Sequence, residues 1–223
     1  MNTELPGTVT IAYVHPNTVT EGFARSVFGA CLWKPSNILG FSSASNPRQT
    51  VARNAAIESF LLGPCEWLMW IDTDMTFYHD AIEKLVATAE KHEADAVSGL
   101  GFIYKRHLNE IIPNGYMWGE EENAFTEILD YASDNVYEID GTGSGFVLIN
   151  RRVFNAWPDK HWHRNWVKHP QTGQEMGHDL AFFYDMTQKL GMKLVWDTNV
   201  KTGHIKHMEL TEANYRAYQE TLA

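Results

Sequence analysis

Residues 66–75 read Glu66-Trp67-Leu68-Met69-Trp70-Ile71-Asp72-Thr73-Asp74-Met75, an apolar run that stops at two carboxylates. The run predicts a strand over Glu66–Ile71, because strands covered on both faces have nearly continuous apolar sequences. In extended backbone, residues i and i+2 point the same way, so Asp72 and Asp74 would face one point. Carboxylate oxygens suit Mg²⁺ and Mn²⁺, which also bind phosphate oxygens. The stretch therefore predicts a metal site, with a polar turn before the next helix as the alternative.

Strands and helices alternate on both sides of this stretch. The patterns predict strands at Thr8–Val14, Asn37–Phe41 and Asp95–Leu100, and helices at Glu21–Trp33, Pro47–Leu62 and Asp80–His92. This alternation is typical of an α/β fold with a mostly parallel central sheet and helices on both faces. Ligands of such sheets bind beyond the carboxyl ends of the strands, so the segments after Val14, Phe41 and Ile71 are the first candidates for a site.

The second half of the chain is less regular. We expect a loop over His107–Asn123, strands at Val136–Ile139, Gly145–Ile149 and Lys193–Trp196, and helices at Asp179–Leu190 and Thr211–Leu222. We find no repeat, low-complexity tract or linker in the 223 residues, a length that suits one domain. The sequence therefore predicts a single domain over residues 1–223.

Charge and hydropathy exclude some functions. The net charge is −10 and no basic stripe is present, whereas proteins that hold nucleic acid need a basic footprint. We therefore expect no stable nucleic-acid partner. The apolar stretch Phe60–Ile71 is interrupted by Gly63, Pro64 and Glu66, so it predicts no membrane span. Residues 1–7 have no signal-peptide pattern, and a cytoplasmic location is the expectation.

Two further segments could contribute to a metal or donor site. His204 lies in Thr202-Gly203-His204-Ile205-Lys206, just past the last predicted strand, and a neutral imidazole can complete an oxygen-rich Mn²⁺ site. A structural histidine is the alternative. Arg53 lies in a helix with an apolar face, where it could extend into solvent, reach a donor or brace the acid pair.

Three segments of the second half could contact an acceptor. The small residues Gly143, Ser144 and Gly145 precede a strand, where a ligand can approach the backbone closely, although a plain turn is equally consistent. The spacing matches neither a dinucleotide-binding nor a P-loop motif. Asp179, after His178, begins a helix, where the helix dipole suffices to explain an acid; alternatively it is a base facing an acceptor hydroxyl. The aromatic-rich stretch His161–Trp166, which includes Trp162, suits a sugar pocket or a surface loop anchored in the core.

Taken in order, these motifs resemble the GT-A-fold glycosyltransferases, especially the small bacterial and phage-type members related to the large family with the xED motif. The resemblance covers roughly Thr8 to Lys206. It implies a metal-dependent glycosyltransferase that moves a sugar from a nucleotide-diphosphate donor, a UDP- or GDP-sugar, to an acceptor hydroxyl. Mn²⁺ or Mg²⁺ is the implied cofactor. Residues from about 8 to 100 would form the nucleotide-sugar half, 101–206 the acceptor side and 207–223 a C-terminal helix.

The resemblance also implies roles for individual residues. Asp72 and Asp74 would serve the ribose and the metal–diphosphate, with Asp74 the more direct ligand, and His204 would be the late metal-binding histidine. On the donor side the further candidates are His15, Pro16, Asn17, Arg53 and Thr73. On the acceptor side they are Gly143, Ser144, Gly145, Trp162, His178 and the catalytic candidate Asp179. The usual Glu-Asp is His178-Asp179 here, and Ser42-Ser43 replaces an acid, so the base and the nucleobase stay open.

Other enzyme classes fit less well. Leu68–Thr76 matches the apolar strand and DxDxT of haloacid-dehalogenase-type phosphatases, but two strand–helix units precede it here and the late strand leads to Asp197 alone. A nucleotidyltransferase would carry a Gly-rich basic loop, which Pro16–Thr20 is not. A non-catalytic nucleotide-sugar-binding module would have no reason to keep both the acid pair and Asp179.

Overall fold

The computed structural model of the chain describes residues 4–35, 37–105, 110–119, 124–164, 167–168 and 175–206. The helix predicted at Thr211–Leu222 lies outside these residues, as do Asn165 and Trp166. None of the helices in the described part of the chain has both the length and the apolar composition that crossing a bilayer requires.

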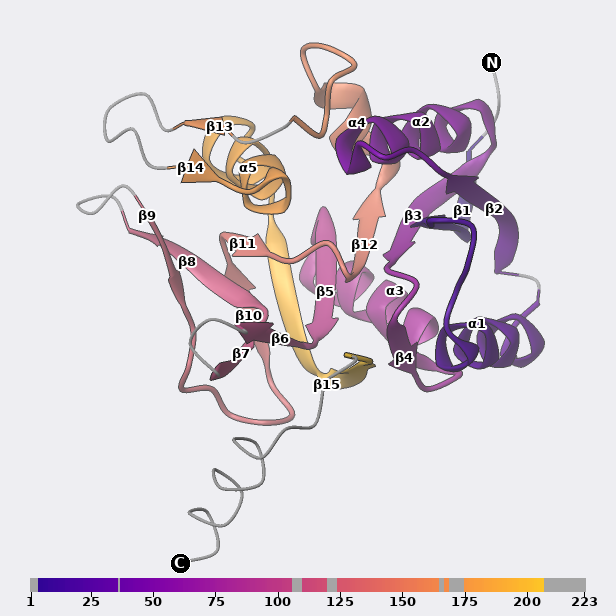
Figure 1. Cartoon of the computed structure of the whole chain (residues 1–223), viewed down its shortest axis with the longest axis horizontal. Helices are drawn as coiled ribbons and strands as arrows, with labels where there is room; N and C mark the ends of the chain where they lie inside the picture. The colour runs from indigo at the N-terminus through magenta and orange to yellow at the C-terminus, as the bar shows by residue number, and fades with distance from the viewer. Residues whose placement is uncertain are drawn as a thin grey trace, which may run out of the picture.

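An eight-stranded sheet runs through the middle of the molecule (Figure 1), in the order β10-β15-β5-β12-β3-β1-β2, with β4 paired to β15. Its strands are β1 (Leu5–Val14), β2 (Ile38–Ala44), β3 (Cys65–Ile71), β4 (Met75–Phe77), β5 (Ala96–Leu100), β10 (Val136–Ile139), β12 (Phe146–Asn150) and β15 (Leu194–His204). Strands β2, β1 and β3 are parallel to one another, as are β5 and β15. Strand β12 lies between these two groups and is antiparallel to both β3 and β5.

The predicted α/β class with helices on both faces is confirmed, and the sheet is mixed. The helices are α1 (Glu21–Trp33), α2 (Gln49–Leu62), α3 (Ala81–His92), α4 (Arg151–Ala156) and α5 (His178–Tyr184), the last continued by a π-helix η1 (Asp185–Lys189). Helices α1 and α3 pack on one face, whereas α2, α4 and α5 pack on the other. The predicted parallel arrangement holds within β2-β1-β3 and within the pair β5-β15. Strand β12 is antiparallel to its neighbours in both groups, and the chain enters it without a crossover helix.

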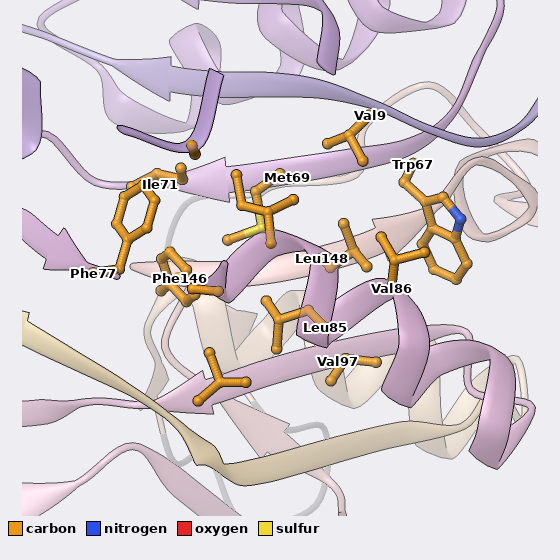
Figure 2. Close-up of a cluster of buried hydrophobic side chains, with 14 of the residues drawn as sticks. Val9, Trp67, Met69, Ile71, Phe77, Leu85, Val86, Val97, Phe146 and Leu148 are labelled. Atoms are coloured by element: carbon orange, nitrogen blue, oxygen red, sulfur yellow. The ribbon is translucent and has the colours of Figure 1, made fainter. Parts of the chain in front are cut away.

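Alternate residues of the central strands fill two cores, one on each face. Met69 and Ile71 of β3 and Leu148 of β12 point to the same side as Leu85 and Val86 of α3, as Figure 2 shows. The residues between them, including Leu68, Trp70 and Ile149, belong to the opposite core with α2 and α4. The continuous apolar run of β3 thus reflects burial on both faces, as its sequence predicts.

Small antiparallel sheets form most of the remaining described chain. They pair β6 (Phe102–Lys105) with β7 (Glu110–Pro113), β8 (Gly115–Gly119) with β9 (Ala124–Glu127) and β11 (Gly141–Thr142), and β13 (Val167–Lys168) with β14 (Glu175–Met176). The prediction of a loop over His107–Asn123 is wrong where this segment is described, because β7 and β8 lie within it. Strand β8 pairs with β11, which is distant in the chain, and local periodicity does not reveal such a partner.

Truncating the β3 core should cost stability. Leu68 is 0% exposed and Leu32 of α1 is 82% exposed. We expect Leu68→Ala to lower the free energy of unfolding by about 2–5 kcal/mol, because a buried leucine leaves a cavity. Leu32→Ala should change it by no more than about 0.5 kcal/mol. Urea unfolding of both variants measures the difference, and equal effects would contradict the described core.

Candidate active site

The loop between β3 and β4 carries Asp72, Thr73 and Asp74 at the carboxyl edge of the sheet. The backbone N–H of Asp72 donates to the Gly145 carbonyl over 2.9 Å, which ties the loop to the entrance of β12. The carbonyl of Thr73 accepts from both the N–H and the hydroxyl of Thr20, over 3.1 and 2.9 Å. Since Thr20 also caps α1, the start of that helix and the acid pair are held together.

His204 and Lys206 meet Asp74 because β15 returns along β4. His204 pairs with Met75 in this antiparallel ladder, and the N–H of Ile205 donates to the Asp74 carbonyl over 2.8 Å. A side chain at Gly203 would lie 2.4 Å from the Thr76 hydroxyl oxygen, so the close approach requires glycine. As a result, the Nε2 of His204 lies 3.2 Å and the Nζ of Lys206 lies 2.8 Å from one carboxylate oxygen of Asp74.

These contacts set the charges at Asp74. Partial burial raises its pKa, but the hydrogen bonds with His204 and Lys206 outweigh burial and lower the pKa to about 2. Burial lowers the pKa of His204, but its hydrogen bonds with Asp74 and the Phe102 carbonyl and the charge of Asp74 together outweigh burial and raise it. Asp74 is therefore ionised at neutral pH and offers a negatively charged oxygen.

Asp74 and His204 fit a divalent cation. The Nδ1 of His204 lies 2.9 Å from the Phe102 carbonyl. A proton kept on Nδ1 and donated to that carbonyl would leave the Nε2 lone pair for a cation lying between His204 and Asp74, in place of their hydrogen bond, which is the usual support of a metal-binding histidine. Asp72 does not complete a three-ligand group with them: within the described residues, only His163, His178 and Asp179 have donor atoms that all lie within 4.8 Å of one another.

Arg53 joins the two sides of the site. Its side chain from α2 is 0% exposed and lies over the Trp70 ring, 4.6 Å from the ring centroid. One guanidinium nitrogen lies 3.1 Å from Asp72 and 3.9 Å from Asp179. Of the three interpretations of Arg53 from sequence, bracing the acid pair is the one that this geometry supports, since the buried side chain does not line the large cleft.

Asp179 begins α5 beside this arginine. Its carboxylate also lies 2.7 Å from the Nδ1 of His178, whose Nε2 lies 3.0 Å from the Gln49 side-chain oxygen. Burial raises the pKa of Asp179, but Arg53 and the hydrogen bond with His178 outweigh it and hold the pKa well below its usual range. Burial raises the pKa of Asp72 despite Arg53. The single guanidinium charge of Arg53 thus pairs with the carboxylates of both Asp72 and Asp179. Asp179 is ionised at neutral pH.

A cleft of about 700 Å³ lies in front of the acid pair. Of the predicted donor-side residues, Pro16, Asp72, Thr73 and Asp74 line it. His15 and Asn17 instead build the turn after β1: the N–H of Asn17 lies 3.1 Å from the His15 Nδ1, and Asn17 has a positive φ of 81°. Sequence reasoning did not name the cleft residues Val14, Thr18, Val19, Thr20, Glu21, Gly22, Gln49 and Ile205 individually. The position of a segment after the carboxyl end of a strand, which made the residues following Val14 candidates, did indicate the region in which several of them lie.

A smaller cavity of about 120 Å³ lies between the predicted metal ligands and the predicted acceptor-side residues. It is lined by Gly143, Ser144 and Gly145, together with Asp72, Asp179 and His204. The structure therefore brings together these predicted residues from both halves of the chain. Trp162 lies elsewhere: it is 2% exposed, and its indole N–H donates to the Phe154 carbonyl over 3.2 Å. This corrects its assignment as an acceptor contact, because an aromatic side chain packed in the core presents no face to a sugar.

Comparisons with known proteins agree with this architecture. Residues 26–158 match the sequence profile described as glycosyl transferase family 2. Among solved structures, the chain is similar to A197 from STIV, with 16% identity and a TM-score of 0.59 over 90% of this chain and 86% of that one. It is also similar to GalNAc-T7 crystallised with UDP, GalNAc and Mn²⁺, with 18% identity and a TM-score of 0.59 over 91% of this chain.

The chain spans 44% of the length of GalNAc-T7, and at these identities the likeness shows the GT-A fold. No curated protein matches the chain significantly. The family profile covers more than half of the residues and includes α2, the acid pair and the Gly-rich entrance of β12. The chain therefore belongs to glycosyl transferase family 2 and is a glycosyltransferase, not a phosphatase or a non-catalytic binding module.

Proposed function

We propose that the chain transfers a sugar from a nucleotide-diphosphate donor, a UDP- or GDP-sugar, to an acceptor hydroxyl with the help of Mn²⁺ or Mg²⁺. The observation that carries this proposal is the charge of the large cleft. Glu21, Asp72 and Asp74 line it, and the described residues that line it include no lysine or arginine. A diphosphate in an acidic cleft requires a cation between the two sets of negative charges. The presence of UDP and Mn²⁺ in the GalNAc-T7 structure supports the same donor chemistry.

Asp74 and His204 are the residues that we assign to the metal. A bound Mn²⁺ or Mg²⁺ supplies positive charge where negative charge builds on the departing nucleotide diphosphate. Lys206 already contacts the same oxygen of Asp74 over 2.8 Å, so it stands beside the diphosphate position as a second cation. Asp72, held by Arg53, is placed for the ribose or for the outer shell of the metal site.

The donor and acceptor sides meet at the smaller cavity. Asp179 and Ser144 line it, and the buried Ser144 hydroxyl has no hydrogen-bond partner among the described residues, so it is available to a sugar. We assign residues from about 8 to 100 mainly to the donor and 101–206 mainly to the acceptor. The low pKa of Asp179 makes it a weak base in the resting protein, so proton transfer to it requires that acceptor binding loosen its contacts with Arg53 and His178.

Nucleotide binding should depend on Asp74. With saturating UDP and Mn²⁺, at about 100 times the dissociation constant, the wild-type chain should melt about 5–10 °C higher. Asp74→Asn should lose this shift, as should the wild-type chain in EDTA. Asp80→Asn is the control, because Asp80 pairs with Lys84 outside the cleft and should keep the shift. An unchanged shift in Asp74→Asn would contradict the assignment of the metal.

Turnover should depend on Asp179. If the enzyme inverts the anomeric carbon, Asp179→Asn should reduce kcat by a factor of about 10²–10⁴ with little change in nucleotide affinity. If it retains the configuration, the loss should appear mainly as a higher KM for the acceptor. Steady-state kinetics and the anomeric configuration of the product by NMR separate these cases. An unchanged rate at subsaturating and saturating acceptor would make Asp179 only a helix-terminal residue.

Removing the charge of Arg53 should destabilise the fold in a pH-dependent way. Arg53→Met leaves Asp72 and Asp179 without their shared cation, which should cost about 3–5 kcal/mol at pH 7. Because the pKa of Asp179 is lowered in the folded protein, its ionised carboxylate stabilises the fold at pH values above its ordinary pKa of 3.8. This stabilisation is lost as the pH falls below that value. The cost of the substitution should therefore shrink as the pH falls through that value. Urea unfolding measures this, with the exposed Arg25→Met as the control.

A further inference from the structure

A buried histidine behind Asp179 has an unused ring nitrogen. His163 is 4% exposed, and its Nδ1 has no hydrogen-bond partner among the described residues. One ring nitrogen of His163, one ring nitrogen of His178 and one carboxylate oxygen of Asp179 all lie within 4.8 Å of one another. Buried polar atoms are normally paired, so an unpaired nitrogen on a histidine of this cluster requires an explanation.

The surrounding side chains hold the His163 ring in place. It stacks on Phe182, with ring centroids 4.8 Å apart and planes 14° apart. Its backbone N–H donates to the side-chain oxygen of Asn54, and its carbonyl accepts from the Asn54 amide, each over 2.9 Å. The stacking and the two backbone hydrogen bonds therefore fix the position of the ring.

We propose that His163, His178 and Asp179 form a second metal site, separate from Asp74 and His204, which takes Zn²⁺ or a similar ion that prefers nitrogen ligands. Two imidazoles and one carboxylate match the ligands of Zn²⁺, whereas Mg²⁺ prefers oxygen alone. Tetrahedral zinc with bonds of about 2.0–2.1 Å needs ligand atoms about 3.3 Å apart. The His178–Asp179 distance of 2.7 Å and the 4.8 Å upper limit of the group lie on either side of this value, so the three ligand atoms have to shift relative to one another when the ion binds.

The positive charge of Arg53 restricts which ions can bind at this site. Its guanidinium lies 3.9 Å from Asp179, which disfavours weakly held cations, but it lies closer to Asp72, at 3.1 Å. An ion that binds imidazole strongly is therefore required. Of the three proposed ligands, Asp179 also lines the small cavity. One consequence rests on the proposed function. Zinc bound to the Asp179 carboxylate, which faces the acceptor, inhibits sugar transfer.

Direct metal binding tests the site without any substrate. Co²⁺ added to the metal-free protein should give the visible absorption of a tetrahedral nitrogen–oxygen site, and Zn²⁺ should displace it. His178→Gln and His163→Phe, which keeps the stacked ring, should each weaken binding by at least the roughly 10–100-fold seen when a supporting partner is lost. Asp74→Asn should leave the spectrum unchanged. Circular dichroism establishes that each variant is folded.

No tetrahedral spectrum, or an unchanged one in both histidine variants, would overturn the second site. Because this assay contains no nucleotide or acceptor, it is independent of transfer. A spectrum that depends on His163 and His178 in a protein without transferase activity would keep the site and count against the proposed function alone. In an active enzyme with excess Mn²⁺, Zn²⁺ should inhibit the wild type at a concentration at least about tenfold lower than it inhibits His178→Gln; equal sensitivity would overturn the inhibitory role.

Discussion

Arg53 places a full positive charge where no part of its side chain reaches solvent, between the Asp72 and Asp179 carboxylates and over the Trp70 ring. A buried charge is tolerated only when it is paired, so the three elements that carry these residues must meet at this point. Helix α2 supplies the cation, the end of β3 one acid and the start of α5 the other. The arginine thereby fixes the relative position of the donor and acceptor sides of the site.

The pairing of β15 with β4 completes the donor side. The ladder places His204 opposite Met75, directly after Asp74, and Gly203 permits the approach because it has no side chain to meet Thr76. The pair of oxygen and nitrogen atoms offered to a cation thus comes from residues 130 positions apart. Under the proposed function, a cation held by this pair, together with Lys206, would allow the acid-lined cleft to accept a diphosphate.

On the proposed acceptor side, the resemblance to GT-A-fold glycosyltransferases implies Glu-Asp where this chain has His178-Asp179, and the consequence extends beyond one residue. An imidazole beside Asp179 and the buried His163 behind it give the carboxylate a nitrogen-rich environment. Metal preference follows ligand type, so the donor and acceptor sides would select different ions. The same replacement helps to keep Asp179 ionised, which links the basicity of this carboxylate to the contacts of its neighbour.

The sequence by itself determined the α/β class, the strand of residues 66–71 and the acid pair after it. A continuous apolar run and its sudden end at charged residues are local patterns that can be recognised without the fold. The sequence also placed the first three helices nearly at their observed bounds. Only the tertiary structure decided that β12 is antiparallel, that Arg53 is a buried brace and that Trp162 belongs to the core. The sequence likewise did not reveal which residues from Thr18 to Gly22 line the cleft, or that His163 lies close to Asp179. These features depend on which distant residues a side chain meets, and periodicity along the chain carries no record of such contacts.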